Sequence, residues 1–445
     1  MEVTNKATRI QLFDFTSPQM RAFHMSWMSF FLAFFGWFGV APLMPVIRED
    51  LGLSKTQIGN IIIASVAITI LVRILIGILC DKFGPRLTYT WLLIIGSLPV
   101  MGIGLSHDYT TFLLARLAIG AIGASFVITQ YHTSVMFAPN VVGTANATSA
   151  GWGNLGGGVT QLVMPIIFSA LVFIGMHEFL AWRVAMVIPG VALFMMGIFY
   201  YFLTQDAPQG NYKELRHQGL IEKTHPMDFS AFFKVMGDYR VWALFVLYGA
   251  CFGVELTINN VAAIYFFDYF SLDLKTAGLI ASLFGLMNLF ARTLGGFFSD
   301  RFALSRGLRG RVMFLFIVVL CEGLALILFS QLTLLWAVIL SLIVFSLFVQ
   351  MSEGATFGLV PFINRRALGP VAGIVGAGGN AGAVAAGFLF RSESLETPEA
   401  FFILGIVVTL CSLLTIFVSF PSDVHEDEKD RLHISVAERK SLEQI

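Results

Sequence analysis

The chain has 445 residues, of which 57% are hydrophobic and 13% are charged, and its mean hydropathy is +0.79. Soluble domains are about 45–50% apolar and about 25% charged, so this composition excludes an ordinary soluble protein and indicates one that crosses a membrane many times. The formal net charge is zero, which argues against a nucleic-acid partner.

Apolar runs of membrane length recur along the chain, and twelve of them are predicted to be spanning helices. In chain order they cover residues 23–46, 57–79, 87–106, 111–136, 143–174, 183–204, 241–267, 276–299, 312–331, 333–359, 371–390 and 400–420. The sequence therefore predicts an all-α multi-pass protein of the cell membrane.

Polar stretches divide these spans into two sets of six. We expect a first bundle over residues 1–204, a cytoplasmic linker over 205–240, a second bundle over 241–421 and a charged tail over 422–445. The first eighteen residues are polar and the first apolar run continues for a full span, so no cleavable signal peptide is expected.

Basic residues predict the orientation of the chain. With both termini in the cytoplasm, 20 of the 28 lysines and arginines fall on the cytoplasmic side, 5 fall outside and 3 lie within spans. This asymmetry agrees with the excess of basic residues found in cytoplasmic loops of membrane proteins.

Two arginines occupy matching places within the predicted spans. Arg73 and Arg292 each lie eight residues before an aspartate, which is Asp81 in the first case and Asp300 in the second. A lone guanidinium at the centre of a spanning helix costs about 3 kcal/mol or more, so intramembrane arginines are candidates for function. A pair at equivalent positions of an internal repeat indicates a positively charged site between two related halves.

Other segments repeat as well. The run from Gly77 to Arg86 matches the run that begins at Gly296 and includes Asp300. The first of these runs resembles the loop signature of the major facilitator superfamily. Arg116 lies in a second stretch that resembles a motif of that superfamily. The resemblance implies two six-helix bundles related by a pseudo-two-fold axis, with Asp81, Arg86, Asp300 and Arg116 as gating candidates; a static role in the loops is the alternative.

The most specific run is Ala150–Gly158, which resembles the signature of the nitrate/nitrite porter family, and Gly376–Gly382 looks like a second copy. Similarity to that family extends to Met20–Trp27, Ala41–Pro45 and Phe252–Thr257. These segments are similar to the branch that contains high-affinity uptake systems of plants, algae and bacteria.

The resemblance implies that Arg73 and Arg292 hold the anion from the two bundles. A guanidinium is planar and permanently charged, and its parallel N–H groups suit a planar oxyanion. The alternative is that each arginine pairs with an intramembrane acid such as Glu255 or Glu353.

The resemblance also implies further substrate-binding residues. They are Tyr248, Phe126, Phe252, Asn154, Asn380, Gly151, Gly153 and Gly379. The phenylalanines are alternatively lipid-facing or core residues, the asparagines alternatively bridge neighbouring helices, and the glycines alternatively provide a smooth sliding surface.

Coupling is expected to involve protons, because the membrane potential opposes anion entry by about 2.3 kcal/mol per 100 mV. Glu255 and Glu353 are the coupling candidates, and Glu322 and His132 are further titratable groups within spans; a structural hydrogen bond is the alternative for each. The expected function is proton-coupled uptake of nitrate, with nitrite as a second substrate, and the alternative is a nitrate/nitrite antiporter.

Other classes fit less well. A carrier of another anion and a non-transporting nitrate receptor stay open, and the sequence does not identify an accessory protein. No paired Ser/His/Asp residues, metal-ligand spacing or nucleotide-binding loop is found, so an enzyme, a metal site and a cofactor are not expected.

Overall fold

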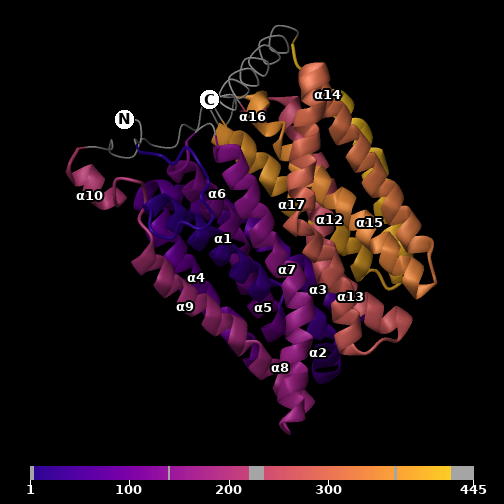
Figure 1. Cartoon of the computed structure of the whole chain (residues 1–445). Coiled ribbons are helices and arrows are strands. Elements are labelled where there is room, and N and C mark those ends of the chain that lie inside the picture. The colour runs from indigo at the N-terminus through magenta and orange to yellow at the C-terminus, as the bar shows by residue number, and fades with distance from the viewer. Residues whose placement is uncertain (1–4, 139–140, 220–234, 365–367, 422–445) are drawn as a thin grey trace. The chain divides into compact units, whose positions relative to one another are not determined.

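The computed structural model describes residues 5–138, 141–219, 235–364 and 368–421, and the regular elements in these ranges are helices (Figure 1). The predicted all-α class is thereby confirmed for the described part of the chain. The predicted tail, 422–445, and residues 220–234 of the predicted linker lie outside the described residues.

The helices follow one another with short connections. In chain order they are α1 Pro18–Trp37, η1 Ala41–Leu43, α2 Met44–Leu51, α3 Lys55–Phe83, α4 Pro85–Gly102, η2 Ile103–Leu105, α5 Tyr109–Gly120, η3 Ala121–Ala124, α6 Ser125–Met136, α7 Val142–Phe173, α8 Glu178–Ala185, α9 Val187–Leu203, α10 Tyr212–His217, α12 Tyr239–Phe270, α13 Leu274–Leu286, η4 Met287–Leu289, α14 Ala291–Gln331, α15 Leu335–Phe357, α16 Val360–Ile363, α17 Leu368–Arg391, α18 Thr397–Cys411 and η6 Ser412–Phe417.

Each of the twelve predicted spans lies largely on described helix. Eleven helical stretches among the described residues are long and apolar enough to cross a membrane, and the longest, Leu274–Gln331, contains two of the predicted spans. Gly307 interrupts that stretch with φ 58° and ψ −145°, a conformation that favours glycine. The chain therefore kinks at Gly307, between the two predicted spans, and is helical on both sides of the kink.

Local sequence sets where several helices begin. Ser54 and Gln57 form a capping box at the start of α3, and Asp108 and Thr111 form another at the start of α5. Such residues satisfy backbone N–H groups that the first helical turn leaves without a partner.

Contacts between Cα atoms divide the chain into two compact units. Unit 1 contains Met1–Asp228, Glu255–Leu289 and Ala383–Thr397, and unit 2 contains Phe229–Val254, Phe290–Gly382 and Pro398–Ile445.

Within unit 1, glycines let helices pack closely. A Cβ added at Gly156 would lie 2.1 Å from the carbonyl oxygen of Phe31, so α7 approaches the backbone of α1. A Cβ at Gly158 would lie 2.6 Å from the carbonyl carbon of Gly285, so α7 approaches α13 in the same way. The α4 and α9 helices run side by side in the same unit (Figure 1).

Within unit 2, α14 packs along α15 and α12 packs on α17. A Cβ at Gly354 of α15 would lie 2.2 Å from the carbonyl oxygen of Arg292 of α14. A Cβ at Gly382 of α17 would lie 2.2 Å from the carbonyl oxygen of Gly249 of α12. Small residues at these crossings permit backbone contact, as is typical of membrane helices.

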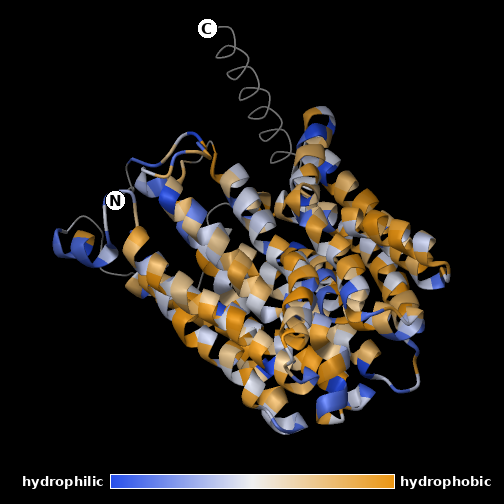
Figure 2. Ribbon diagram, turned by 60° about the horizontal axis from the view of Figure 1, so that its bottom comes forward, coloured by the Kyte–Doolittle hydropathy of each residue, from blue (hydrophilic) through white to orange (hydrophobic). Residues whose placement is uncertain are grey.

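Apolar residues dominate the helices along their length, and polar residues gather mainly toward helix ends and connections (Figure 2). Large apolar side chains such as Leu71, Leu98, Phe173 and Trp336 are more than half exposed. Because the chain spans the membrane repeatedly, these side chains are suited to contact lipid.

Candidate functional site

Arg73 lies on α3 and is 7% exposed. Its guanidinium carbon lies 5.4 Å from the centroid of the Phe126 ring, so the cation packs over an aromatic face. One turn before Arg73, α3 is joined to the end of α5, because the Thr69 hydroxyl donates to the carbonyl oxygen of Gly120 at 2.7 Å. Unit 1 therefore holds one buried cation against an aromatic ring.

A second ring extends this cluster to the glycine-rich signature on α7. The Phe126 centroid lies 5.7 Å from that of Phe30 on α1. A Cβ at Gly153 would lie 1.8 Å from the Phe30 ring, so only glycine fits there without a shift of that ring. The signature glycine thus lets an aromatic side chain of α1 reach the neighbourhood of Arg73.

Arg292 on α14 contacts two side chains of unit 2. Its Nη1 atom lies 2.5 Å from Oε2 of Glu353 on α15, and its Nη2 atom donates to the Tyr248 hydroxyl on α12 at 3.1 Å. The Arg292 and Glu353 side chains are 5% and 0% exposed. The structure thus pairs Arg292 with the intramembrane acid that the sequence offered as its alternative partner.

The second arginine cluster also reaches its copy of the signature through aromatic rings. Tyr248 stacks on Phe252 with centroids 5.2 Å apart and rings inclined by 15°. A Cβ at Gly379 on α17 would lie 2.3 Å from the Phe252 ring. Arg292, Tyr248, Phe252 and Gly379 therefore form one contiguous cluster.

The two clusters have the same plan, each within its own unit. Each contains an arginine, an aromatic ring beside the guanidinium, a second ring and the glycine before the signature asparagine. Sequence analysis did not single out Phe30, whose position against Gly153 corresponds to that of Phe252 against Gly379. The sequence signal for Phe30 is the equivalence of Gly153 and Gly379 in the two signature copies. Because Gly379 faces a phenylalanine, Gly153 is expected to face one as well.

Asn154 follows Gly153 but contacts an acid rather than Arg73. Its Nδ2 atom donates to Oε2 of Glu255 at 3.2 Å, and Nδ2 of Asn288 donates to Oε1 of the same carboxyl group at 2.7 Å. All three side chains are at most 1% exposed. The structure thus adds Asn288, which the sequence analysis did not name, and Gly151 lies beside it, since a Cβ there would be 3.1 Å from the Asn288 carbonyl oxygen.

Asn380 and Arg116 lie apart from these contacts. Both side-chain polar atoms of Asn380 are buried and have no hydrogen-bond partner among the described residues. Arg116 is 1% exposed and donates to the Trp37 carbonyl oxygen at 2.6 Å and to Oδ1 of Asn260 at 3.2 Å. Arg116 therefore ties α5 to α1 and α12 within unit 1.

The loop candidates make local contacts. Asp300 pairs with Arg311 at 2.6 Å within unit 2. In unit 1, Nε of Arg86 donates to the Tyr201 carbonyl oxygen at 2.7 Å, and Nη2 of Arg216 on α10 donates to the Asp81 carbonyl oxygen at 2.6 Å.

Asp206 organises the same region, although its sequence context gave no signal. Its carboxylate accepts from the backbone N–H groups of Arg86 at 2.8 Å and Tyr212 at 2.9 Å. Burial raises the pKa of Asp206, and those two N–H groups and the nearby charges of Arg86 and Arg216 oppose the rise. Asp206 thereby fastens the start of the linker to the loop between α3 and α4.

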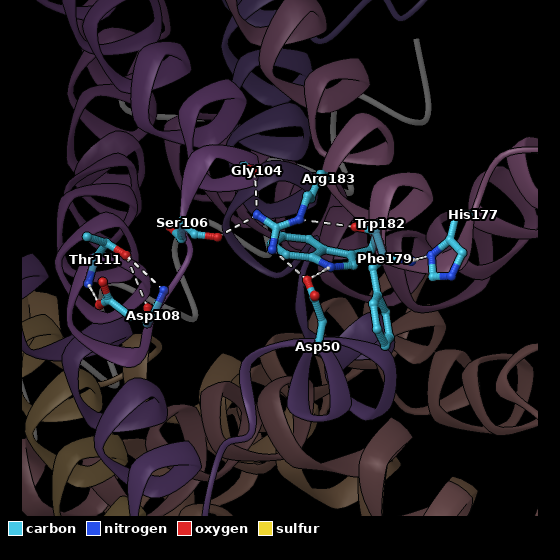
Figure 3. A network of polar contacts seen from close by, with 9 residues as sticks. All are labelled: Asp50, Gly104, Ser106, Asp108, Thr111, His177, Phe179, Trp182 and Arg183. Carbon is cyan, nitrogen blue, oxygen red and sulfur yellow. Dashed lines mark hydrogen bonds and ion pairs between the residues drawn. The ribbon is translucent and has the colours of Figure 1, made fainter.

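A polar network joins the connections at the opposite end of unit 1 (Figure 3). The Arg183 guanidinium pairs with Asp50 at 2.6 Å and donates to the carbonyl oxygens of Gly104, at 2.7 Å, and Ser106. The Trp182 indole N–H donates to the same carboxylate at 2.8 Å. Asp50 neutralises the charge of Arg183, and carbonyl oxygens of the connection between α4 and α5 accept its N–H groups. Arg183 therefore has a structural role and does not form an open anion site.

A cavity of about 760 Å³ lies among α3, α4 and α5 in unit 1. Its lining is apolar and includes Val72, Leu75, Trp91, Leu92 and Ala118. It offers no cation to an anion and suits an acyl chain better than a polar substrate.

Comparison with known proteins gives a family and a fold. The model of the Major Facilitator Superfamily matches residues 26–363 and 255–443. Two solved transporters share the fold at low sequence identity: a D-xylose-proton symporter, with a TM-score of 0.69 and 14% identity over 90% of this chain and 97% of that one, and a bacterial homologue of the human lysosomal transporter Spinster, with 0.66 and 15% over 94% and 98%.

Curated relatives are similar over nearly their whole length. The chain is 44% identical to high affinity nitrate transporter 2.5 of Arabidopsis thaliana over 422 residues, which are 95% of this chain and 84% of the relative. It is 41% identical to high-affinity nitrate transporter 2.3 of Oryza sativa subsp. japonica over 94% and 81%, and 31% identical to the nitrate/nitrite transporter NrtP of a Picosynechococcus strain over 81% and 83%.

Proposed function

Since the chain belongs to the major facilitator superfamily and, within it, to the nitrate/nitrite porter family, as the sequence predicted, we propose that it transports nitrate, with nitrite as a second substrate, by alternating access. Its family is one of transporters, so the chain is a membrane transporter and not an enzyme. The proposal concerns the substrate, the residues that bind it and the ion that drives it.

The two arginine clusters are the observation that carries the proposal. Arg73 offers a buried guanidinium over the Phe126 ring, and Arg292 offers a buried guanidinium that donates to the hydroxyl of an aromatic residue, Tyr248. Nitrate is planar, weakly hydrated and anionic at every physiological pH, so its charge requires a fixed cation. Two parallel N–H groups of a guanidinium match two oxygens of the anion, and a flat ring beside them suits a flat ligand better than a tetrahedral one.

We assign supporting roles to the residues around the arginines. The Tyr248 hydroxyl and the Phe126 and Phe252 rings shape the anion contacts, and the signature glycines Gly153 and Gly379 give those clusters their room. Asn154 acts through Glu255 rather than through the anion, because its Nδ2 atom donates to that carboxyl group.

Uptake against the membrane potential requires a companion cation or an exchanged anion. We propose protons as the companion, with the termini in the cytoplasm and the transporter in the cell membrane. The buried acids Glu255 and Glu353 support proton coupling, since a proton on either changes the charge of its cluster. The basic residues concentrated on one side of the chain support the orientation.

Uptake into proteoliposomes tests the proposal. Purified full-length protein is reconstituted, and nitrate uptake is measured with and without an inward proton gradient, with a parallel set preloaded with nitrite. Uptake stimulated by the gradient without internal anion is the expected result. Uptake only into nitrite-loaded vesicles, indifferent to pH, would instead establish exchange, and absence of nitrate movement in both sets would refute the substrate.

Arginine variants test the assignment of the binding residues independently of the assignment of the substrate. Arg73→Ala and Arg292→Ala are expected to abolish saturable transport while membrane insertion and detergent-solubilised size stay unchanged. Saturable transport in both variants would refute the two-arginine assignment and leave the nitrate activity standing.

A further inference from the structure

We propose that Glu353 is a proton-binding residue that controls whether Arg292 is available to the anion, so that anion and proton bind to unit 2 together. This inference rests on the proposed role of Arg292 in nitrate transport. The proposed function names Glu255 and Glu353 as acids that support proton coupling. The inference assigns the coupling of proton and nitrate binding to Glu353.

The Arg292–Glu353 ion pair is the starting observation. The two side chains are almost wholly buried, and Nη1 of Arg292 lies 2.5 Å from Oε2 of Glu353. The carboxylate is planar and accepts from the guanidinium edge, as an oxyanion substrate would. Glu353 and nitrate therefore compete for the same kind of donor on the same arginine.

Charge balance decides how that competition ends. With Glu353 ionised, Arg292, Glu353 and an added nitrate together carry a net charge of −1 within unit 2. Even if Arg73 of unit 1 supplies a further positive charge, the carboxylate and the anion repel each other at the same guanidinium in a buried place, which is unfavourable. With Glu353 protonated, guanidinium and nitrate neutralise each other. The proton moves from water to a Glu353 oxygen, the ion pair breaks, and the freed N–H group of Arg292 donates to the anion; when both ligands leave, the pair forms again.

Such competition makes the two binding events reciprocal. If a proton on Glu353 raises the affinity for nitrate by some factor, bound nitrate raises the affinity for the proton by the same factor. Bound together, one proton and one nitrate add no net charge to the cluster. The local chemistry therefore favours cotransport at one proton per anion for this site.

Backbone packing leaves protonation as the simplest way to release Arg292. A Cβ at Gly354 would lie 2.2 Å from the Arg292 carbonyl oxygen, and a Cβ at Gly295 would lie 2.3 Å from the Met351 carbonyl oxygen. The segments that carry the two partners are thus in backbone contact. Drawing the charges apart by separating α14 from α15 would open this packed interface.

The described part of unit 2 contains further ionisable groups that interact with Glu353, with Arg292 or with Glu322. They are Arg292 and Glu322 on α14 and Tyr248 and Cys251 on α12, with Cys411 on α18 beyond Glu322. Glu322 is fully buried but makes no ion pair among the described residues, so a proton on Glu322 would release no arginine. In unit 1, Glu255 is held by two amides rather than by a described cation. Glu353 is therefore the acid best placed to govern an anion-binding arginine.

Nitrate binding to purified full-length protein, measured by calorimetry between pH 5.5 and 8.5, tests the inference. For the unaltered protein we expect binding to weaken up to about tenfold per pH unit once Glu353 is ionised. We also expect uptake of about one proton per bound nitrate in that range, measured with an indicator dye in weak buffer. Glu353→Gln, which mimics the protonated acid, should bind nitrate with an affinity that does not change with pH and should take up no proton.

Transport adds a second readout. Glu353→Gln should keep nitrate counterflow, which needs no net proton movement, and should lose accumulation driven by a proton gradient. Glu322→Gln should keep the pH dependence of binding. The matched control is Asp268→Asn, which removes the acid from the exposed Arg48–Asp268 ion pair and should change neither readout.

The outcomes distinguish this inference from the proposed function. An unaltered protein that neither binds nor transports nitrate would refute both. Nitrate binding without proton uptake, Glu353→Gln with the original pH dependence, or loss of that dependence only in Glu322→Gln would each refute the inference alone. If Glu353→Gln does not fold, absence of proton uptake by the unaltered protein would still refute the inference, and an unchanged pH dependence in Glu322→Gln and Glu255→Gln would support it.

Discussion

Arg73 differs from Arg292 in the neighbour that the structure places against it, which is the face of the Phe126 ring. A lysine at this position keeps the charge but loses both the planar contact with that ring and the pair of parallel donors. We therefore expect Arg73→Lys to lower nitrate transport at least about tenfold, because hydrogen bonds to charged groups contribute about 1.5–3 kcal/mol each. Initial rates of counterflow over a range of nitrate concentrations measure the loss.

Arg48→Lys is the control for this substitution. Arg48 pairs with Asp268 where both side chains are substantially exposed, and exposed pairs contribute little energy. Its counterflow should match that of the unaltered protein. Equal rates for Arg73→Lys and the unaltered protein would show that neither the donor fork nor the ring contact at Arg73 serves the anion.

At this scale the sequence indicates candidate residues, whereas their partners depend on how the helices pack. The internal repeat identified Arg73 and Arg292, because buried arginines at matching positions are rare for energetic reasons. It offered both Glu255 and Glu353 as partners, and choosing between them requires helix rotation, which a single sequence does not specify. Asn288 escaped notice because it lies outside the repeated motifs, in a short 3₁₀ turn, η4.

Among the elements, α7 contains a glycine that leaves no room for a side chain at a helix crossing. Gly158 faces Gly285 backbone to backbone, and an added Cβ would lie 2.6 Å from the nearest atom. Gly158→Ala should therefore push α7 from α13 and lower the unfolding temperature, since overpacking costs about 1–3 kcal/mol. Thermal unfolding of the purified protein in detergent measures the effect, and nitrate counterflow should fall with it.

Gly143→Ala is the matched control on the same helix. A Cβ at Gly143 would meet nothing within 4 Å, and alanine favours helix over glycine. Its unfolding temperature should equal or exceed that of the unaltered protein. If Gly158→Ala were as stable as Gly143→Ala, the close α7–α13 contact would not be a constraint on the fold.

Helix positions follow from hydropathy, whereas interruptions within helices do not. The span predicted over residues 111–136 is divided in the structure into α5, η3 and α6. The segment Ala121–Ala124 is apolar and small, so its composition gives no sign of a 3₁₀ turn. Such a turn depends on packing against neighbouring helices, here on Trp37, whose ring would lie 2.4 Å from a Cβ at Gly123.

For the whole molecule, hydropathy and the repeated motifs led to the correct fold class and family. Membrane solvation restricts spanning segments to helices and closed barrels, so composition alone removes most folds. The division into two compact units is harder to predict from the sequence. One boundary, at Val254–Glu255, falls inside α12, where no change in composition marks it.

The orientation of the whole molecule is expected to place both termini in the cytoplasm. Its basis is the placement of 20 lysines and arginines on one side and 5 on the other, which favours cytoplasmic termini. The connection between α4 and α5 then faces outward, and α10 faces the cytoplasm. In intact cells, an impermeant maleimide should label His107→Cys, whereas Gln218→Cys should react only after the membrane is opened. A parent whose four natural cysteines are replaced removes the background, and the reverse labelling pattern would invert the proposed topology and with it the direction assigned to uptake.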